Sequence, residues 1–176
     1  MAVTSSTASN LIIGAGDVFI DGADIGATMD SNSYAIDTEW YVPDLNGVPG
    51  ELQGTRYKSS ETAVMGFTMP ELSAAKLVQM WPNSSSATVG TVTTIDTDDT
   101  RRVSTASYHD YTLQVDGLDG VQLNFYADNA LNQNGLQMEL SDDGTAAIAA
   151  EVMATWDGAD MTSSPHRIKR ITGVSS

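Results

Sequence analysis

Hydrophobic and polar residues alternate along most of the chain, and this pattern predicts a mainly β protein. In residues 34–41, mostly aromatic and aliphatic side chains fall on one face, and Asp37 and Glu39 fall on the other. A period of two residues is the pattern of a strand with one buried face. The same reasoning predicts further strands at residues 17–20, 25–29, 56–69, 110–116, 121–125, 136–140 and 146–156.

Two of these strand predictions rest on additional signals. The Asp21-Gly22 pair lies between apolar runs and is typical of a tight hairpin turn, which makes residues 25–29 the returning strand. The alanine-rich residues 146–156 would also permit a helix. Their alternation persists as far as Trp156 and favours a strand.

One helix is predicted between Pro70 and Pro82, with Pro70-Glu71 in its first turn. The spacing of Leu77, Met80 and Trp81 places them on one face, where we expect them to pack against the core. Residues 83–99, rich in Ser, Thr and Val, fit either a weak strand pair or an exposed loop.

These elements indicate a β-sandwich or barrel of about eight strands with one flanking α-helix. The length of 176 residues is that of one domain, and no linker or internal repeat divides it. We expect an N-terminal arm at residues 1–10, a β domain at residues 11–165 and a basic C-terminal arm at residues 166–176.

The predicted strands 34–41 and 56–69 are separated by residues 42–55, which are dense in turn-forming residues. Loops of this length are usually functional or disordered. The sequence therefore predicts a hairpin that projects from its own domain. Its loop residues are Pro43, Asp44, Leu45, Asn46, Gly47, Val48, Pro49, Gly50 and Glu51.

The formal net charge is −15 at pH 7, from 23 acidic and 8 basic residues. This balance argues against tight binding of DNA or RNA, which needs Lys and Arg to neutralise phosphates, and against docking on anionic membranes. No apolar run approaches the roughly 20 residues that span a bilayer, and residues 1–10 lack the features of a secretory signal. The charge fits either general solubility or a surface that repels a polyanion.

Three of the basic residues, Arg167, Lys169 and Arg170, lie in the last ten residues of the chain. Residues 1–165 carry a net −18, and residues 166–176 carry a net +3. A basic tail on an acidic body could bind another copy of that body. The alternative is a solvated chain end, as termini commonly are.

The sequence offers little catalytic chemistry. It has no cysteine, and neither His109 nor His166 has a metal-spaced or serine partner that the sequence identifies. Carboxylates are abundant, but a glycosidase cleft needs two of them at a set distance and is usually lined by aromatics. The acidic residues 96–99 lack the glycine and glutamate of an EF-hand calcium loop. We expect no enzyme activity, no cofactor and no metal.

Several segments occur in an order that matches a known family. They are residues 11–22 (LIIGAGDVFIDG), Gly-Ala-Thr at 26–28, Glu39-Trp40-Tyr41, Pro49-Gly50 with Gly54-Thr55, and Glu71-Leu72-Ser73 before the helix. Over roughly the first half of the chain, this order resembles the major tail tube proteins of phages with long, non-contractile tails.

The resemblance implies a structural virion protein in the phage tail, assembled in the host cytoplasm. Family members form hexameric rings in which each subunit adds strands to a continuous inner β-barrel. The rings stack into a tube that conducts DNA during ejection. The implied partners are copies of the chain itself, a tape measure protein, and tail-terminator and tail-tip proteins.

The resemblance also suggests roles for particular residues. The family's loop after the second inner strand reaches the next ring, and here it matches residues 42–55. Terminal arms bridge rings in the family, which gives Arg167, Lys169 and Arg170 a possible inter-ring role. An acidic lumen would not hold DNA, and our candidates for its lining are Asp37, Glu39, Glu61, Glu151 and Asp157.

A different class of function stays open. The chain could be an acidic β-sandwich binding module of a tail fibre or surface protein, which recognises carbohydrate or depends on Ca²⁺. The acidic turns favour this alternative, and the aromatic content of 7% weakens it.

Overall fold

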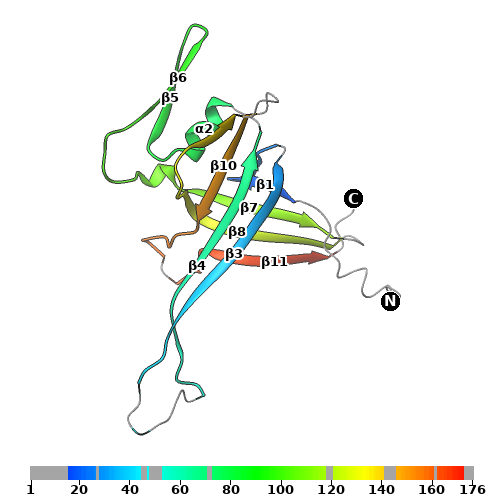
Figure 1. Ribbon diagram of the computed structural model, residues 1–176, viewed down its shortest axis with the longest axis vertical. Helices are drawn as coiled ribbons and strands as arrows, with labels where there is room; N and C mark the ends of the chain where they lie inside the picture. Colours follow the sequence, from blue (N-terminus) through cyan, green and yellow to red (C-terminus); the bar gives the residue numbers. More distant parts are fainter. Residues whose placement is uncertain are drawn as a thin grey trace.

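The computed structural model describes residues 16–26, 28–44, 47, 53–70, 73–117, 121–140, 146–160 and 162–172. The protein is mainly β, with a single α-helix in the described ranges (Figure 1). None of the described helical segments is long and apolar enough to cross a membrane. The N-terminal arm expected at residues 1–10 lies outside the described residues.

The described part of the chain contains eleven strands rather than about eight. They are β1 (Asp17–Ile20), β2 (Ala23–Asp24), β3 (Met29–Tyr41), β4 (Tyr57–Met69), β5 (Ser84–Val89), β6 (Val92–Thr97), β7 (His109–Asp116), β8 (Val121–Asn132), β9 (Gln137–Leu140), β10 (Ala146–Met153) and β11 (His166–Thr172). The helix α2 spans Ala74–Met80, and a 3₁₀ turn η1 spans Thr105–Ser107.

Nine of these strands belong to one branched sheet. Its main path runs β2-β1-β7-β8-β10-β4-β3, while β11 pairs with β8 and β9 pairs with β10. The strands β5 and β6 form a separate two-stranded sheet. No pairing among the described residues joins the two ends of the path, β2 and β3, so this part of the chain forms no closed barrel.

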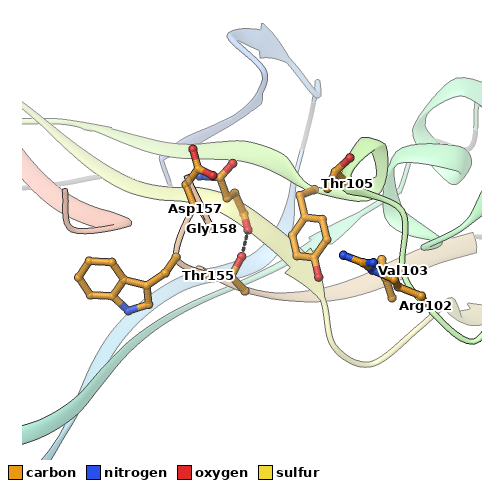
Figure 2. A pocket seen from close by; sticks show the side chains of 9 residues that line it. Arg102, Val103, Thr105, Thr155, Asp157 and Gly158 are labelled. Carbon is orange, nitrogen blue, oxygen red and sulfur yellow. Dashed lines mark hydrogen bonds between the residues drawn. The ribbon is translucent and has the colours of Figure 1, made fainter. Parts of the chain in front are cut away.

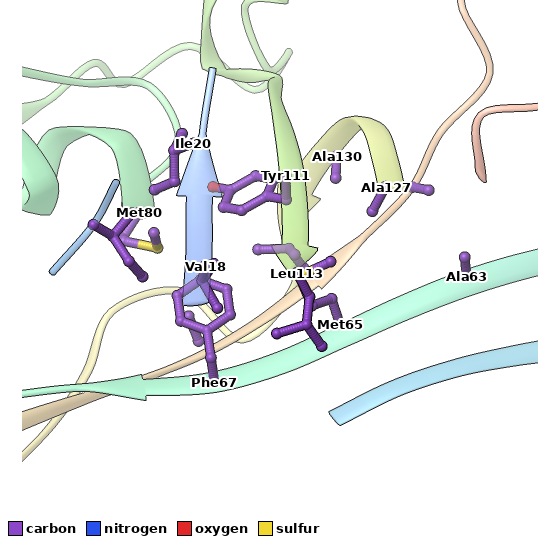
Figure 3. Close-up of a cluster of buried hydrophobic side chains, with 14 of the residues drawn as sticks. Val18, Ile20, Ala63, Met65, Phe67, Met80, Tyr111, Leu113, Ala127 and Ala130 are labelled. Carbon is purple, nitrogen blue, oxygen red and sulfur yellow. The ribbon is translucent and has the colours of Figure 1, made fainter. Parts of the chain in front are cut away.

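The branched sheet folds into two layers that cross at a steep angle (Figure 1). The first sheet is β3-β4-β10-β9, and the second sheet is β2-β1-β7-β8-β11. Alternate residues of both sheets pack between them, as Figure 3 shows. The buried core includes Val18, Ile20, Ala63, Met65, Phe67, Tyr111, Leu113, Ala150 and Val152 from the strands, and Met80 from α2.

Local sequence explains the first hairpin, but the predicted returning strand was misplaced. Asp21 and Gly22 adopt φ values of 50° and 78°, which suits the Asp-Gly turn that joins strands with their natural twist. The return is the two-residue β2, Ala23–Asp24, rather than residues 25–29.

The helix is shorter than predicted. It begins after Ser73, whose hydroxyl accepts a hydrogen bond from the Lys76 N–H, and not at Pro70-Glu71. Of the three residues predicted for the core face, Met80 is fully buried, and Leu77 and Trp81 are partly buried. Residues 84–97 form the strand pair β5–β6, which excludes the loop alternative for most of that segment.

The C-terminal segments also differ from expectation. The strand interpretation of the alanine-rich region is confirmed, but β10 ends at Met153 instead of continuing to Trp156. The basic residues 166–172, expected as an arm, form β11 and pair in antiparallel register with β8 over their whole length. In the single chain this segment is therefore part of the second sheet.

Candidate functional site

The two faces of the first sheet differ sharply in chemistry. Residues of β4 and β10 that point into the molecule are buried, whereas Asp37, Glu39 and Glu151 are exposed. The register pairs Asp37 with Thr62, Glu39 with Ser60, and Glu151 with Gly66, and residues paired across antiparallel strands share a face. All three carboxylates therefore lie on the outward side of the first sheet, which we call the acidic face.

The positions around these three carboxylates on β3, β4 and β10 are mostly small and uncharged. They include Ser33, Ala35, Ser60, Thr62, Val64, Gly66, Thr68, Ala149 and Met153. None of these positions holds Lys or Arg, so no cation on these strand positions offsets the three carboxylates. Glu39 accepts a hydrogen bond of 2.8 Å from the Ser60 hydroxyl, and Glu151 accepts one of 3.4 Å from the Asn134 amide.

Glu61, which we grouped with the lumen candidates, lies on the opposite side of the β3–β4 hairpin. It pairs with Thr38, whose hydroxyl donates to it at 3.3 Å, and its carboxylate reaches His166 at 2.5 Å and Lys58 at 3.1 Å. Hydrogen bonds from Lys58 and then His166 hold the pKa of Glu61 below its usual value. Glu61 joins the two sheets and is not part of the acidic face.

An extra residue in β4 explains how Lys58 reaches Glu61. The register shifts between the pairs Glu39–Ser60 and Trp40–Lys58, which leaves Ser59 without a partner on β3. Such a bulge reverses which side the following residues face. Lys58 and Glu61 consequently lie on the same side of the hairpin, although residues three apart in a regular strand face opposite sides.

His166 has a serine neighbour that sequence reasoning missed. Its side chain is 6% exposed. The Ser164 hydroxyl lies 3.4 Å from Nδ1 of the ring, and the Glu61 carboxylate is hydrogen-bonded to Nε2. The hydroxyl, however, donates to the His166 carbonyl oxygen at 3.0 Å. Because that proton is directed at the backbone, these groups form a structural network and not an activated nucleophile.

A partly buried tyrosine borders this network. The Tyr34 hydroxyl donates to the Tyr126 carbonyl oxygen at 2.9 Å, and its ring packs against Phe125 with centroids 5.2 Å apart. Burial raises the pKa of Tyr34 to about 12. Tyr34 and Glu61 of the first sheet thus contact the second sheet at the polar edge of the core.

Asp157 does not lie on a strand, because β10 ends before it. Its carboxylate accepts a hydrogen bond of 2.9 Å from the Ala159 N–H and so stabilises a turn. Asp157, Trp156, Tyr108 and Arg102 line a surface hollow of about 490 Å³. Figure 2 shows Asp157 close to Thr155 in this hollow. Trp156 is 49% exposed. Asp157 therefore belongs to this hollow and not to the acidic face.

The projecting hairpin is described only in part. Val42, Pro43, Asp44 and Gly47 are described, while Leu45, Asn46, Val48, Pro49, Gly50 and Glu51 lie outside the described residues. The last core residue of β4 toward this end is Ala63. Since a strand rises about 3.3 Å per residue, the stem from residue 63 to 57 extends roughly 20 Å beyond the core.

The stem of this hairpin exposes large apolar side chains. Trp40, Tyr41 and Tyr57 are each more than half exposed, and the Arg56 guanidinium lies 5.8 Å from the centroid of the Trp40 ring. Exposed aromatic groups gathered at one projection are typical of interaction surfaces.

The basic C-terminal residues are displayed along β11. Arg167 pairs with Asp128, and Arg167 and Lys169 both lie over the Tyr126 ring, at 4.3 and 5.2 Å from its centroid. Arg170 is exposed on the other side of the strand. Sequence reasoning found these charges but not the strand that carries them.

Comparisons with known proteins add no assignment to this geometry. No protein-family model matches the sequence, and a search of curated proteins finds no significant match. Within the described ranges, no group of three or more His, Asp or Glu residues is placed to hold a metal ion.

Proposed function

We propose that this protein polymerises into a tube, as the major tail tube proteins of long-tailed phages do, and that its acidic face lines the lumen. The observation that carries the proposal is the acidic face itself. Asp37, Glu39 and Glu151 occupy exposed positions where the fold needs no charge. They stand among neutral residues and face away from the core.

The edges of the first sheet support the proposal. In the order β3-β4-β10-β9, neither outer edge is paired with a strand in the described residues. Unpaired edges expose backbone donors and acceptors that pair readily with another chain. Pairing of β3 in one copy with β9 in the next would join the first sheets into a closed barrel of several subunits and turn the acidic face inward.

An acidic lumen suits passage of DNA. Duplex DNA carries about one negative charge per 1.7 Å of its axis, and proteins hold it by replacing counterions with Lys and Arg. The acidic face offers neither residue, so the wall repels the phosphates and the DNA slides. Its role is conduction, and we propose no catalytic step and no bound cofactor.

The projecting hairpin provides the contact between rings in this proposal. Its stem extends beyond the core, and the loop 42–55 would dock on the ring below it. Burial of Trp40, Tyr41 and Tyr57 in that contact would explain their exposure in the single chain. The protein would be part of the virion tail, in contact with tape measure, terminator and tip proteins at the ends of the tube.

Negative-stain electron microscopy of the purified protein over a range of concentrations tests the proposal. We expect hollow tubes or rings with a central opening. A matched variant, in which residues 46–54 are replaced by a short Gly-Ser turn, should keep its melting temperature and form rings that do not stack. If the wild-type protein stays monomeric at every concentration, the proposal is wrong; if the variant still forms normal tubes, only the role of the loop is wrong.

The hollow beside Trp156 favours a second candidate, a carbohydrate-binding module. A half-exposed indole next to Asp157 and Arg102 offers both an apolar face and hydrogen-bonding groups, as sugar sites do. Calorimetric titration with neutral oligosaccharides, with and without Ca²⁺, separates this alternative from the first. Saturable binding that Trp156→Ala abolishes would favour it, whereas tube formation without binding would exclude it.

A further inference from the structure

The two edges of the second sheet carry opposite charge. The order β2-β1-β7-β8-β11 places β11 at one edge and the β1–β2 hairpin at the other. The β11 edge carries Arg167, Lys169 and Arg170, and the β1–β2 hairpin carries Asp17, Asp21 and Asp24. The sheet is therefore basic along one side and acidic along the opposite side.

The basic edge is open to a partner. The strand β11 pairs with β8 on one side and with no other strand in the described residues. Ile168 is 52% exposed and Ile171 is 38% exposed, so apolar groups stand between the charges. Arg167 and Lys169 fold over the Tyr126 ring and do not shield the edge, as protective edge lysines do.

The carboxylates of the acidic edge are only partly neutralised by the side chains around them. Asp17 and Asp24 are exposed, and the Asp24 carboxylate accepts a local hydrogen bond from the Gly26 N–H, at 2.8 Å. Asp21 contacts His109 at 2.7 Å. Among the described residues, the Lys76 ammonium also reaches this corner and donates to the Ile25 carbonyl oxygen. Three carboxylates against one ammonium leave the edge acidic.

The charged edges lie along the direction in which the proposed rings stack. Figure 1 shows β11 on the side from which the β3–β4 hairpin projects, with β8, β7 and β1 following toward the opposite end, where β5–β6 projects. The basic edge and the stem of the β3–β4 hairpin are thus at one end of the molecule. The acidic edge is toward the other end.

We infer that the second sheet forms an axial contact between copies of this chain, in which the β11 edge of one copy docks on the β1–β2 edge of the next. This inference rests on the proposed function and adds to it the acceptor surface and the mode of contact. Charge complementarity identifies the partner: in a chain of net charge −15, a basic edge attracts the acidic edge of another copy. Because different surfaces meet head to tail along one axis, the contact repeats without closing.

Salt separates this contact from the lateral one. Raising NaCl from about 0.1 M to about 1 M shortens the screening length from about 10 Å to about 3 Å, which weakens contacts between exposed charges. Backbone pairing between first sheets depends little on charge. High salt should therefore weaken the stacking of rings more than the rings themselves, with the apolar hairpin contact as the remaining link between rings.

The decisive experiment reverses the charge of the basic edge and then restores complementarity by reversing the acidic edge. The readout is the lowest protein concentration at which tubes form, measured by pelleting and by negative stain. Lys169→Glu/Arg170→Glu should raise that concentration by at least about tenfold, because like charges then meet at the contact. Arg101→Glu makes the same change of charge as the single Lys169→Glu, in the exposed segment between β6 and β7, and should have little effect. Adding Asp17→Lys/Asp24→Lys to the first variant should restore assembly.

Melting curves show whether each variant is folded. The single variant Lys169→Glu reverses one charge instead of two and is the smaller perturbation of the fold. Rescue by the reversed acidic edge supports the contact, since a variant that only misfolds is not rescued by further substitution. Wild-type tubes together with unchanged assembly of Lys169→Glu/Arg170→Glu would overturn this contact and leave the proposed function standing. A wild-type protein that forms neither rings nor tubes would overturn both.

Discussion

The inward and outward faces of the first sheet are built by alternate residues of the same strands. On the inward face, Met65, Phe67 and Val152 are at most 3% exposed and pack against the second sheet. On the outward face, Asp37, Glu39 and Glu151 are exposed, and their contacts are with polar neighbours or solvent. Each face is regular over several residues, yet only the inward face has a role in holding the fold together.

The inward residues are required for the stability of the fold, whereas the outward carboxylates are not. Burial of apolar surface explains Met65, Phe67 and Val152 on the inward face. It explains no carboxylate of the outward face, where Ser, Thr or Lys would fit the strands as well. The acidic face therefore calls for a cause outside the single chain, and passage of a polyanion beside it is the cause that we propose.

The largest expected effect comes from breaking the inward face. Phe67→Ala removes a ring that is 3% exposed and lies 6.0 Å from the Tyr111 ring, so it should lower the free energy of unfolding by about 3–5 kcal/mol. Urea unfolding measures this loss. The neighbouring outward change Thr68→Ala is the control, and equal losses for the two variants would refute the assignment of faces.

A smaller, pH-dependent effect is expected where a charge lies on the inward side. Hydrogen bonds from Lys58 and His166 lower the pKa of Glu61, so its ionised form stabilises the folded state above the ordinary carboxyl pKa. That contribution is lost as the pH falls through the lowered pKa. Glu61→Gln should thus melt lower than wild type at pH 7, and the gap should shrink toward pH 3. A gap that is the same at both pH values would contradict this role.

The smallest effect on stability is expected from the outward face. Asp37→Asn, Glu39→Gln and Glu151→Gln should each change the free energy of unfolding by no more than about 0.5 kcal/mol, because they remove no buried contact. Urea unfolding of the three single variants and their combination measures this. A loss above about 2 kcal/mol in any single variant would mean that the fold does depend on the acidic face.

The sequence predicted the strands well where alternation was strong and tertiary pairing agreed with it. Residues 34–41 and most of the predicted strands lie in observed ones, and the alanine-rich segment is a strand. The strand β11 was missed because Ile168 and Ile171 are three residues apart and give no period of two. Its conformation comes from pairing with β8, which depends on contacts distant in sequence.

The candidate site was predictable only in part, for a related reason. Asp37 and Glu39 share a face because they are two residues apart on one strand, which the sequence alone reveals. The side on which Glu61 lies depends on the register between β3 and β4, and no local pattern encodes that register. The position of Asp157 beyond β10 was not predicted, because the alternation continues past Met153 while the strand does not.

The most direct test of the central claim is chemical access to single cysteines, which the cysteine-free chain permits. Asp37→Cys and Glu151→Cys probe the acidic face, and Asp116→Cys, exposed on the outward side of the second sheet, is the control. All three should react with a small maleimide and, before polymerisation, with a maleimide on a protein-sized carrier. In assembled tubes, we predict that the large reagent reaches only Asp116→Cys. Equal labelling of all three sites in intact tubes would contradict the claim that the acidic face lines a lumen.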